Sequence, residues 1–254
     1  MLNAILGGKA PRAELSRDQA PSWRHLMREN EDLVTATLIE RLSYLPGAIA
    51  WTILAKTYEG QLPAFRMASF DSIEFWPRWD YSVDDRSHVE PDAFFQLTLG
   101  DPAQRWHVIF EAKHRAEQYA KQWRLEQDAY LARPDEEDET LPDRIVFMAL
   151  GGLRGSTGAA AARMIGQQVS DERQRRGGAA VEILTVAADW SDMAQALAEV
   201  EPHAEHEARL ISDMIEALAI FGYRHLTLSD GLLHAGPFED WQSSMDTLGW
   251  SKTS

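Results

Sequence analysis

The chain of 254 residues contains no cysteine and no long apolar run. Disulfide bonds and thiolate zinc sites are therefore excluded, which fits the cytoplasmic location that we predict. The most apolar stretch, residues 46–55, is interrupted by Gly47 and followed by Lys56. It falls short of the roughly 18 apolar residues that a membrane-spanning helix needs. The N-terminus shows no apolar core behind a basic start, so we expect neither a signal peptide nor a membrane partner.

Positive charge is scarce, with 25 Lys and Arg residues against 40 Asp and Glu residues and a formal net charge of −15. A protein that binds nucleic acid without the help of a partner usually presents a basic surface, because neutralisation of phosphates drives binding. The charge balance therefore argues against a free-standing DNA-binding protein. It argues less against a nuclease to which partner protein subunits, or a second copy in a homo-oligomer, present the DNA.

The pattern of apolar and turn-forming residues predicts a chain that alternates between helices and strands. Strands are expected at residues 65–76, 93–99, 106–110, 144–150 and 181–187, with a hairpin connection at 79–88. Helices are expected at residues 29–45, 116–132, 191–200 and 203–222, in the alanine-rich segment after residue 158, and as a helix or turn at 51–58.

This order predicts an α/β fold with a mixed central β-sheet flanked by helices, because the first strands pair as a meander and the later ones are joined through helices. We divide the chain into an N-terminal arm at residues 1–28, a core at residues 29–190 and a C-terminal helical region at residues 191–254. The C-terminal region is expected to pack on the core.

Two carboxylates and an ammonium are predicted to meet at one end of this sheet. Asp92 precedes one strand, and Glu111 and Lys113 stand two residues apart at the end of the next. Residues two apart on a strand share a face, and the turn at residues 100–102 favours an antiparallel pair. Carboxylates bind Mg²⁺ or Mn²⁺, and such an ion activates water for attack on a phosphodiester, with the lysine orienting or deprotonating that water. The alternative is a salt bridge at a strand end.

The sequence Pro91–Asp92, followed by Glu111–Ala112–Lys113 on the next strand, resembles the signature of the PD-(D/E)XK nuclease superfamily. The order of elements over residues 29–187 is also similar to the core of that superfamily. The resemblance implies a restriction-endonuclease-like core with extra C-terminal helices, and a Mg²⁺ (or Mn²⁺) cofactor. It further implies hydrolysis of DNA, in bacterial restriction or antiphage defence as part of a complex.

Two further positions match this resemblance. Many members carry a glutamate in the first core helix that completes the metal shell, and Glu31 is our choice for it, with Glu29 as the second. Many also carry a glutamine on the helix after the lysine strand, which orients the lysine, the water or the DNA backbone. Gln122 fits this position, with Glu126 on the same helix face, and Gln118 is its rival one turn earlier.

Three residues are candidates for substrate contact: His114 beside the lysine, Arg154 in a glycine-rich turn, and Arg173 in a basic run. The glycine-rich turn lacks the Gly-Lys-Ser/Thr ending of a phosphate-binding loop, so a strand-to-helix turn is the simpler interpretation. The basic run has an equal alternative as an exposed helix end. Trp241 and Trp250 in the tail are candidates for a partner surface.

The sequence thus predicts a metal-dependent nuclease that cleaves DNA, with Asp92, Glu111, Lys113 and Gln122 in the catalytic machinery. The acidic balance and the tryptophans of the tail favour a second interpretation, a catalytically weak or inactive subunit that binds or scaffolds. A nuclease acting on RNA is a third.

Overall fold

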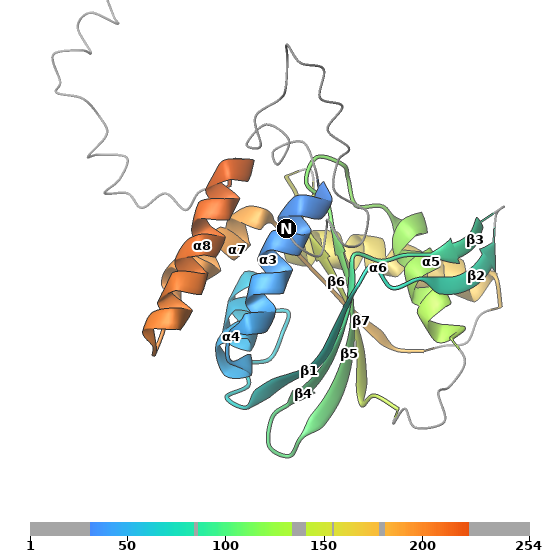
Figure 1. Ribbon diagram of the computed structural model, residues 1–254. Coiled ribbons are helices and arrows are strands. Elements are labelled where there is room, and N and C mark those ends of the chain that lie inside the picture. The colour runs from blue at the N-terminus through green and yellow to red at the C-terminus, as the bar shows by residue number, and fades with distance from the viewer. Residues whose placement is uncertain (1–30, 84–85, 134–140, 154, 178–180, 224–254) are drawn as a thin grey trace, which may run out of the picture. The chain divides into compact units, whose positions relative to one another are not determined.

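The computed structural model describes residues 31–83, 86–133, 141–153, 155–177 and 181–223. The predicted arm at residues 1–28 and the tail with Trp241 and Trp250 lie outside these ranges. Within them the chain forms the mixed α/β architecture expected from the sequence (Figure 1).

A mixed sheet of five strands forms the centre of the fold, in the order β1-β4-β5-β6-β7. The strands are β1 (Ala68–Phe75), β4 (Ala93–Leu99), β5 (Gln104–Ala112), β6 (Arg144–Leu150) and β7 (Ile183–Ala188). Strands β1, β4 and β5 are antiparallel neighbours, whereas β5, β6 and β7 are parallel. The difference follows from the connections, because a short turn returns the chain antiparallel while a crossover helix returns it parallel.

Helices cover both faces of this sheet (Figure 1). One face packs against α3 (Glu31–Tyr44), α4 (Gly47–Thr57), α7 (Trp190–Glu199) and α8 (Glu205–Phe221), and the other against α5 (Ala120–Leu131) and α6 (Gly158–Arg175). Along β5, Val108 and Phe110 belong to the first core, and Ile109 belongs to the second. Because both faces of the sheet are buried, the sequences of β5 and β6 are nearly continuous apolar runs.

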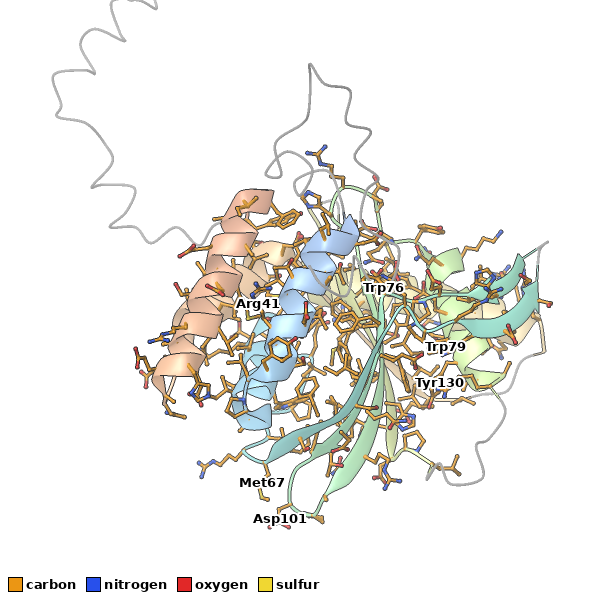
Figure 2. All side chains as sticks on the ribbon, viewed as in Figure 1. Arg41, Met67, Trp76, Trp79, Asp101 and Tyr130 are labelled. Atoms are coloured by element: carbon orange, nitrogen blue, oxygen red, sulfur yellow. The ribbon has the colours of Figure 1, made fainter. Side chains whose placement is uncertain are left out.

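A two-stranded hairpin, β2 (Trp79–Val83) and β3 (Arg86–Val89), lies beside α5 and separate from the main sheet. The sequence indicated a polar hairpin connection there, without strands of its own. Trp79 of the hairpin and Tyr130 of α5 point toward each other (Figure 2), with ring centroids 5.9 Å apart. The hairpin is therefore anchored by an aromatic contact between residues that are far apart in the sequence. The polar local sequence does not indicate such a contact.

Helix α5 begins four residues later than the sequence indicated, at Ala120 instead of Ala116. The backbone of the preceding segment bonds elsewhere, since the amide of Gln118 donates to the carbonyl of Gly152 at 3.1 Å. In the part of the chain that the structure describes, no helix has both the length and the apolar content required to cross a membrane.

Candidate active site

Asp92 and Glu111 lie side by side because β4 and β5 pair in an antiparallel register that sets Ala93 opposite Phe110. Asp92 comes directly before β4, and its Oδ2 accepts a hydrogen bond from the backbone amide of Ala112 at 2.8 Å. Both carboxylates are buried, with exposed fractions of 8 % for Asp92 and 2 % for Glu111. The predicted juxtaposition of these two residues is therefore present in the structure.

The ammonium of Lys113 joins two carboxylates from distant parts of the chain. Its Nζ contacts Oε1 of Glu111, and it also lies 3.2 Å from Oε1 of Glu31 at the start of α3. The second oxygen of Glu31 accepts from the backbone amide of His114 at 2.6 Å. Glu31 thus reaches the cluster from α3, whereas its predicted role in completing a metal shell stays a prediction. Its rival Glu29 lies outside the described residues.

Helix α5 supplies a glutamine to the same carboxylate. Nε2 of Gln122 donates to Oε1 of Glu111, the oxygen that Lys113 also contacts. The rival Gln118 donates instead to the main-chain carbonyl of Glu111 at 3.3 Å, and its own oxygen accepts from the indole of Trp123 at 2.7 Å. Gln122 is therefore the residue that orients the carboxylate, whereas Gln118 fixes the strand that carries it.

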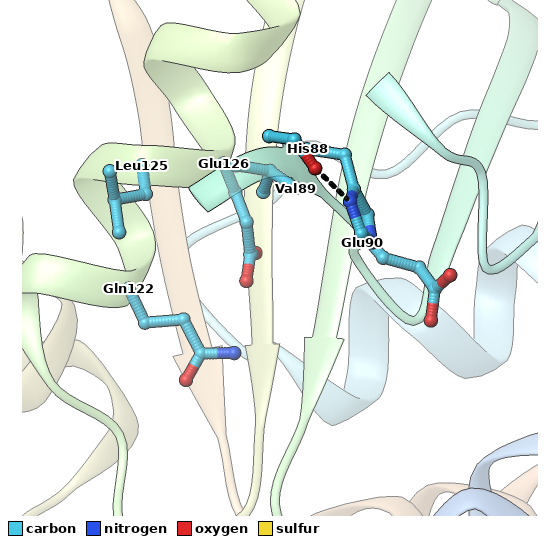
Figure 3. Close-up of a pocket in the computed structure, with 7 residues that line it drawn as sticks. His88, Val89, Glu90, Gln122, Leu125 and Glu126 are labelled. Atoms are coloured by element: carbon cyan, nitrogen blue, oxygen red, sulfur yellow. Dashed lines mark hydrogen bonds between the residues drawn. The ribbon is translucent and has the colours of Figure 1, made fainter. Parts of the chain in front are cut away.

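Glu126, one turn after Gln122, is a further member of the cluster that the sequence interpretation did not assign to the site. It is 2 % exposed, and among the described residues its Oε2 has no hydrogen-bond partner. Glu126 and Gln122 line an open pocket of about 430 Å³, whose other side is lined by residues 87–90 of β3 and its end (Figure 3). The signal for Glu126 was its four-residue spacing from Gln122, which places both on one helix face.

Burial dominates the electrostatics of the cluster. It raises the pKa of Asp92, with repulsion from Glu111 adding to the effect, and raises the pKa of Glu111, with repulsion from Glu126 adding to it. Burial also raises the pKa of Glu126, to about 8. For Lys113, burial alone would lower the pKa, but the carboxylates of Glu111 and Asp92 raise it above its ordinary value. One ammonium thus faces several buried carboxyls, an environment that favours an additional cation.

The main chain of Lys113 is held from both sides at the end of the sheet. Its amide donates to the carbonyl of Leu150 at 2.7 Å, and its carbonyl accepts from the indole Nε1 of Trp190 at 2.9 Å. Gly151 passes beside this second bond with a φ of +76°, and a Cβ there would lie 2.1 Å from the carbonyl oxygen of Lys113. The glycine-rich segment is a strand-to-helix turn, and its first glycine is required by the close approach of Lys113.

We therefore expect Gly151→Ala to lower the free energy of unfolding by roughly 3 kcal/mol or more, because it combines a strained φ with a steric clash. The matched control is Gly60→Ala, since Gly60 has a φ of +74° and no atom within 4 Å of the added Cβ. It should cost only about 1–2 kcal/mol. Urea denaturation measures both values, and equal losses in the two variants would contradict the clash.

The three predicted substrate-binding residues occupy different surroundings. Nδ1 of His114 lies 2.8 Å from the hydroxyl of Tyr223, just after α8, and Arg154 lies outside the described residues. Arg173 donates at 2.9 Å to both Asp128 and Gln127 and so ties α6 to α5. His114 and Arg173 are thus engaged by neighbouring elements. These contacts do not support their predicted role in substrate binding, which stays a prediction.

Comparisons with known proteins show sequence similarity but indicate no activity. No family model matches the chain, and no solved structure matches it. An uncharacterized protein of Pasteurella multocida is 30 % identical to it over 156 residues, which are 60 % of this chain and 54 % of that protein. The chain therefore spans about half the length of this curated relative.

Proposed function

We propose that this protein is a metal-dependent nuclease that hydrolyses DNA phosphodiester bonds and has a restriction-endonuclease-like core. The observation that carries the proposal is the convergence of side chains from four segments on one buried cluster: Asp92, Glu111, Lys113, Glu31 and Gln122. Gathering several carboxylates around one ammonium costs stability that pairing only partly offsets, and such clusters are found preferentially at functional sites. The resemblance of Pro91–Asp92 and Glu111–Ala112–Lys113 to the PD-(D/E)XK signature supports the same function.

The donor set fits Mg²⁺ or Mn²⁺. Among the described residues no three His, Asp or Glu side chains lie close enough together to enclose an ion. Mg²⁺ does not require such a cage, because it usually keeps several waters and binds through one or two carboxylates. Asp92 and Glu111 would provide these carboxylates. Glu31 is connected to them by its hydrogen bond from the ammonium of Lys113. When bound, the ion would lower the pKa of a water and offset negative charge on the phosphate.

The chain's own residues then have separate roles. The ammonium of Lys113 is stabilised by three carboxylates, so we propose that it neutralises charge that develops on the phosphate and does not act as a base. Gln122 holds Glu111 in one orientation through its Oε1. Trp190 and Gly151 fix the main chain of Lys113, and the carboxylates of Glu111 and Glu31 hold its ammonium.

We also propose a setting in bacterial restriction or antiphage defence, in the cytoplasm and within a complex. A formal charge of −15 repels a polyanion, so partner subunits or a second copy would help to present the DNA. The same charge is the observation that favours a binding or scaffolding subunit with weak or no cleavage as the second candidate.

A plasmid-nicking assay with Mg²⁺ or Mn²⁺, and with EDTA as the metal-free arm, tests the proposal. We expect cleavage by the wild type, and a loss of roughly a hundredfold or more in Lys113→Met. The matched control is Lys56→Met, because Lys56 pairs with Glu199 at 3.0 Å on another surface. The nuclease proposal fails if the wild type does not cut with either metal, or if Lys113→Met cuts as fast as Lys56→Met. Cleavage of RNA in preference to DNA would reassign the substrate.

A further inference from the structure

A basic concavity of about 420 Å³ lies between α5 and α6. Four of its lining residues are cationic and one is a carboxylate; they are Lys121 and Arg124 from α5, Glu172 and Arg175 from α6, and Arg176 directly after α6. The excess of positive charge at this surface contrasts with the formal charge of −15 for the whole chain. The concavity is therefore a local exception in an acidic protein.

The cationic side chains differ in how they are held. Arg124 is 3 % exposed and pairs with Asp128 at 2.9 Å, so its side chain is a fixed part of the wall whose charge is largely compensated. Arg175 and Arg176 are 72 % and 50 % exposed, and both contact the carboxylate of Glu172, at 3.0 Å and 2.8 Å. Exposed pairs of this kind contribute little to stability, because water screens the charges. An incoming anion can therefore compete with Glu172 for both guanidinium groups.

The concavity is linked to the candidate active site through α5. Lys121 lines the concavity, and the next residue, Gln122, contacts Glu111. The two sites thus lie on different sides of a single helix. A polymer that carries a phosphate at every unit can contact both sides of such a helix, whereas a single small anion cannot.

We infer that the concavity binds a backbone phosphate of the nucleic acid at a distance from the bond that is cut. The inference rests on the proposed function and deepens it by assigning DNA capture to a defined surface. Guanidinium groups match phosphate because their planar donors bind two of its oxygens at once, and lysine adds a point charge. Glu172 competes for the same donors and so limits the affinity.

The first test measures binding of a fluorescein-labelled DNA duplex to the full chain by anisotropy in EDTA, where a metal-dependent enzyme does not cut. We expect the double variant R175A/R176A to bind at least about fivefold more weakly, and its salt dependence to flatten by about 0.9 for each phosphate that is no longer neutralised. The control is Arg209→Ala, because Arg209 forms the same kind of exposed pair with Glu205 on α8. It should leave both quantities unchanged.

The second test predicts a change in the opposite direction. Glu172→Gln removes the competing carboxylate and should tighten binding a few-fold at low salt, because the carboxylate of residue 172 then no longer competes with the phosphate for the two guanidinium groups. Glu205→Gln on α8 removes one negative charge from a similar pair and is its control. Equal gains from the two substitutions would show a general charge effect and would overturn a specific site.

These readouts separate the inference from the proposed function. Wild-type cleavage together with unchanged binding in R175A/R176A overturns the inference and leaves the nuclease proposal intact. Binding that depends on the concavity, without cleavage under any metal, supports the inference and overturns the nuclease. If the wild type does not bind the duplex at all, the inference fails.

Discussion

Asp92→Asn is expected to remove almost all cleavage activity while leaving the fold at least as stable as the wild type. Burial raises the pKa of Asp92, and repulsion from Glu111 raises it further, so the metal-free protein gains from losing this charge. An amide is close in shape to a protonated carboxyl, and Asn can still accept the hydrogen bond from the amide of Ala112. It cannot replace an anionic metal ligand, so we expect a rate loss of roughly a thousandfold.

The experiment pairs plasmid nicking with thermal unfolding in EDTA. Asp71→Asn is the matched control, because Asp71 is an exposed carboxylate on β1 of the same sheet that accepts a hydrogen bond from Thr98 at 2.6 Å. It should change neither rate nor stability. A clear fall in the melting temperature of Asp92→Asn would show that the carboxylate is structural, and retained cleavage would remove Asp92 from the catalytic machinery.

The proximity of the predicted site residues follows from local rules. Asp92, Glu111 and Lys113 could be placed together because strand residues alternate in direction, and because a short turn makes consecutive strands antiparallel. The structure keeps that register, with Ala93 opposite Phe110. The mixed sheet and its flanking helices could be predicted for the same reason, since every strand of the main sheet is marked by its own apolar pattern.

What the sequence could not predict depends on contacts between distant segments. The bond from Trp190 to the carbonyl of Lys113 spans 77 positions, and no local pattern marks it. The burial of Glu126 depends on how α5 lies against the sheet and the β2–β3 hairpin, and charged residues are ordinarily expected outside. Arg173 was placed with substrate-binding residues because it lies in a basic run, whereas packing of α6 on α5 gives it Asp128 as a partner.

Glu126 leads to a prediction about stability and pH in the metal-free protein. Burial raises its pKa from 4.5 to about 8, so between these values the folded chain keeps a proton that the unfolded chain has released. The free energy of unfolding must therefore fall as pH rises through this window. Since one pKa unit corresponds to about 1.4 kcal/mol, the loss is on the order of a few kcal/mol. The raised pKa values of Asp92 and Glu111 act in the same direction.

Glu126→Gln should weaken this pH dependence, because an amide resembles the protonated carboxyl and does not ionise. Thermal unfolding in EDTA at intervals from pH 5 to pH 8 measures it: the wild type should lose stability across the range, and the variant should lose less and be the more stable at pH 8. Glu205→Gln is the control, because Glu205 is 81 % exposed on α8 and its neutralisation should leave the slope unchanged. If the stability of Glu126→Gln and that of the wild type change in parallel with pH, Glu126 is already ionised in the folded protein. The prediction is then wrong, and the buried cluster carries the negative charge of Glu126.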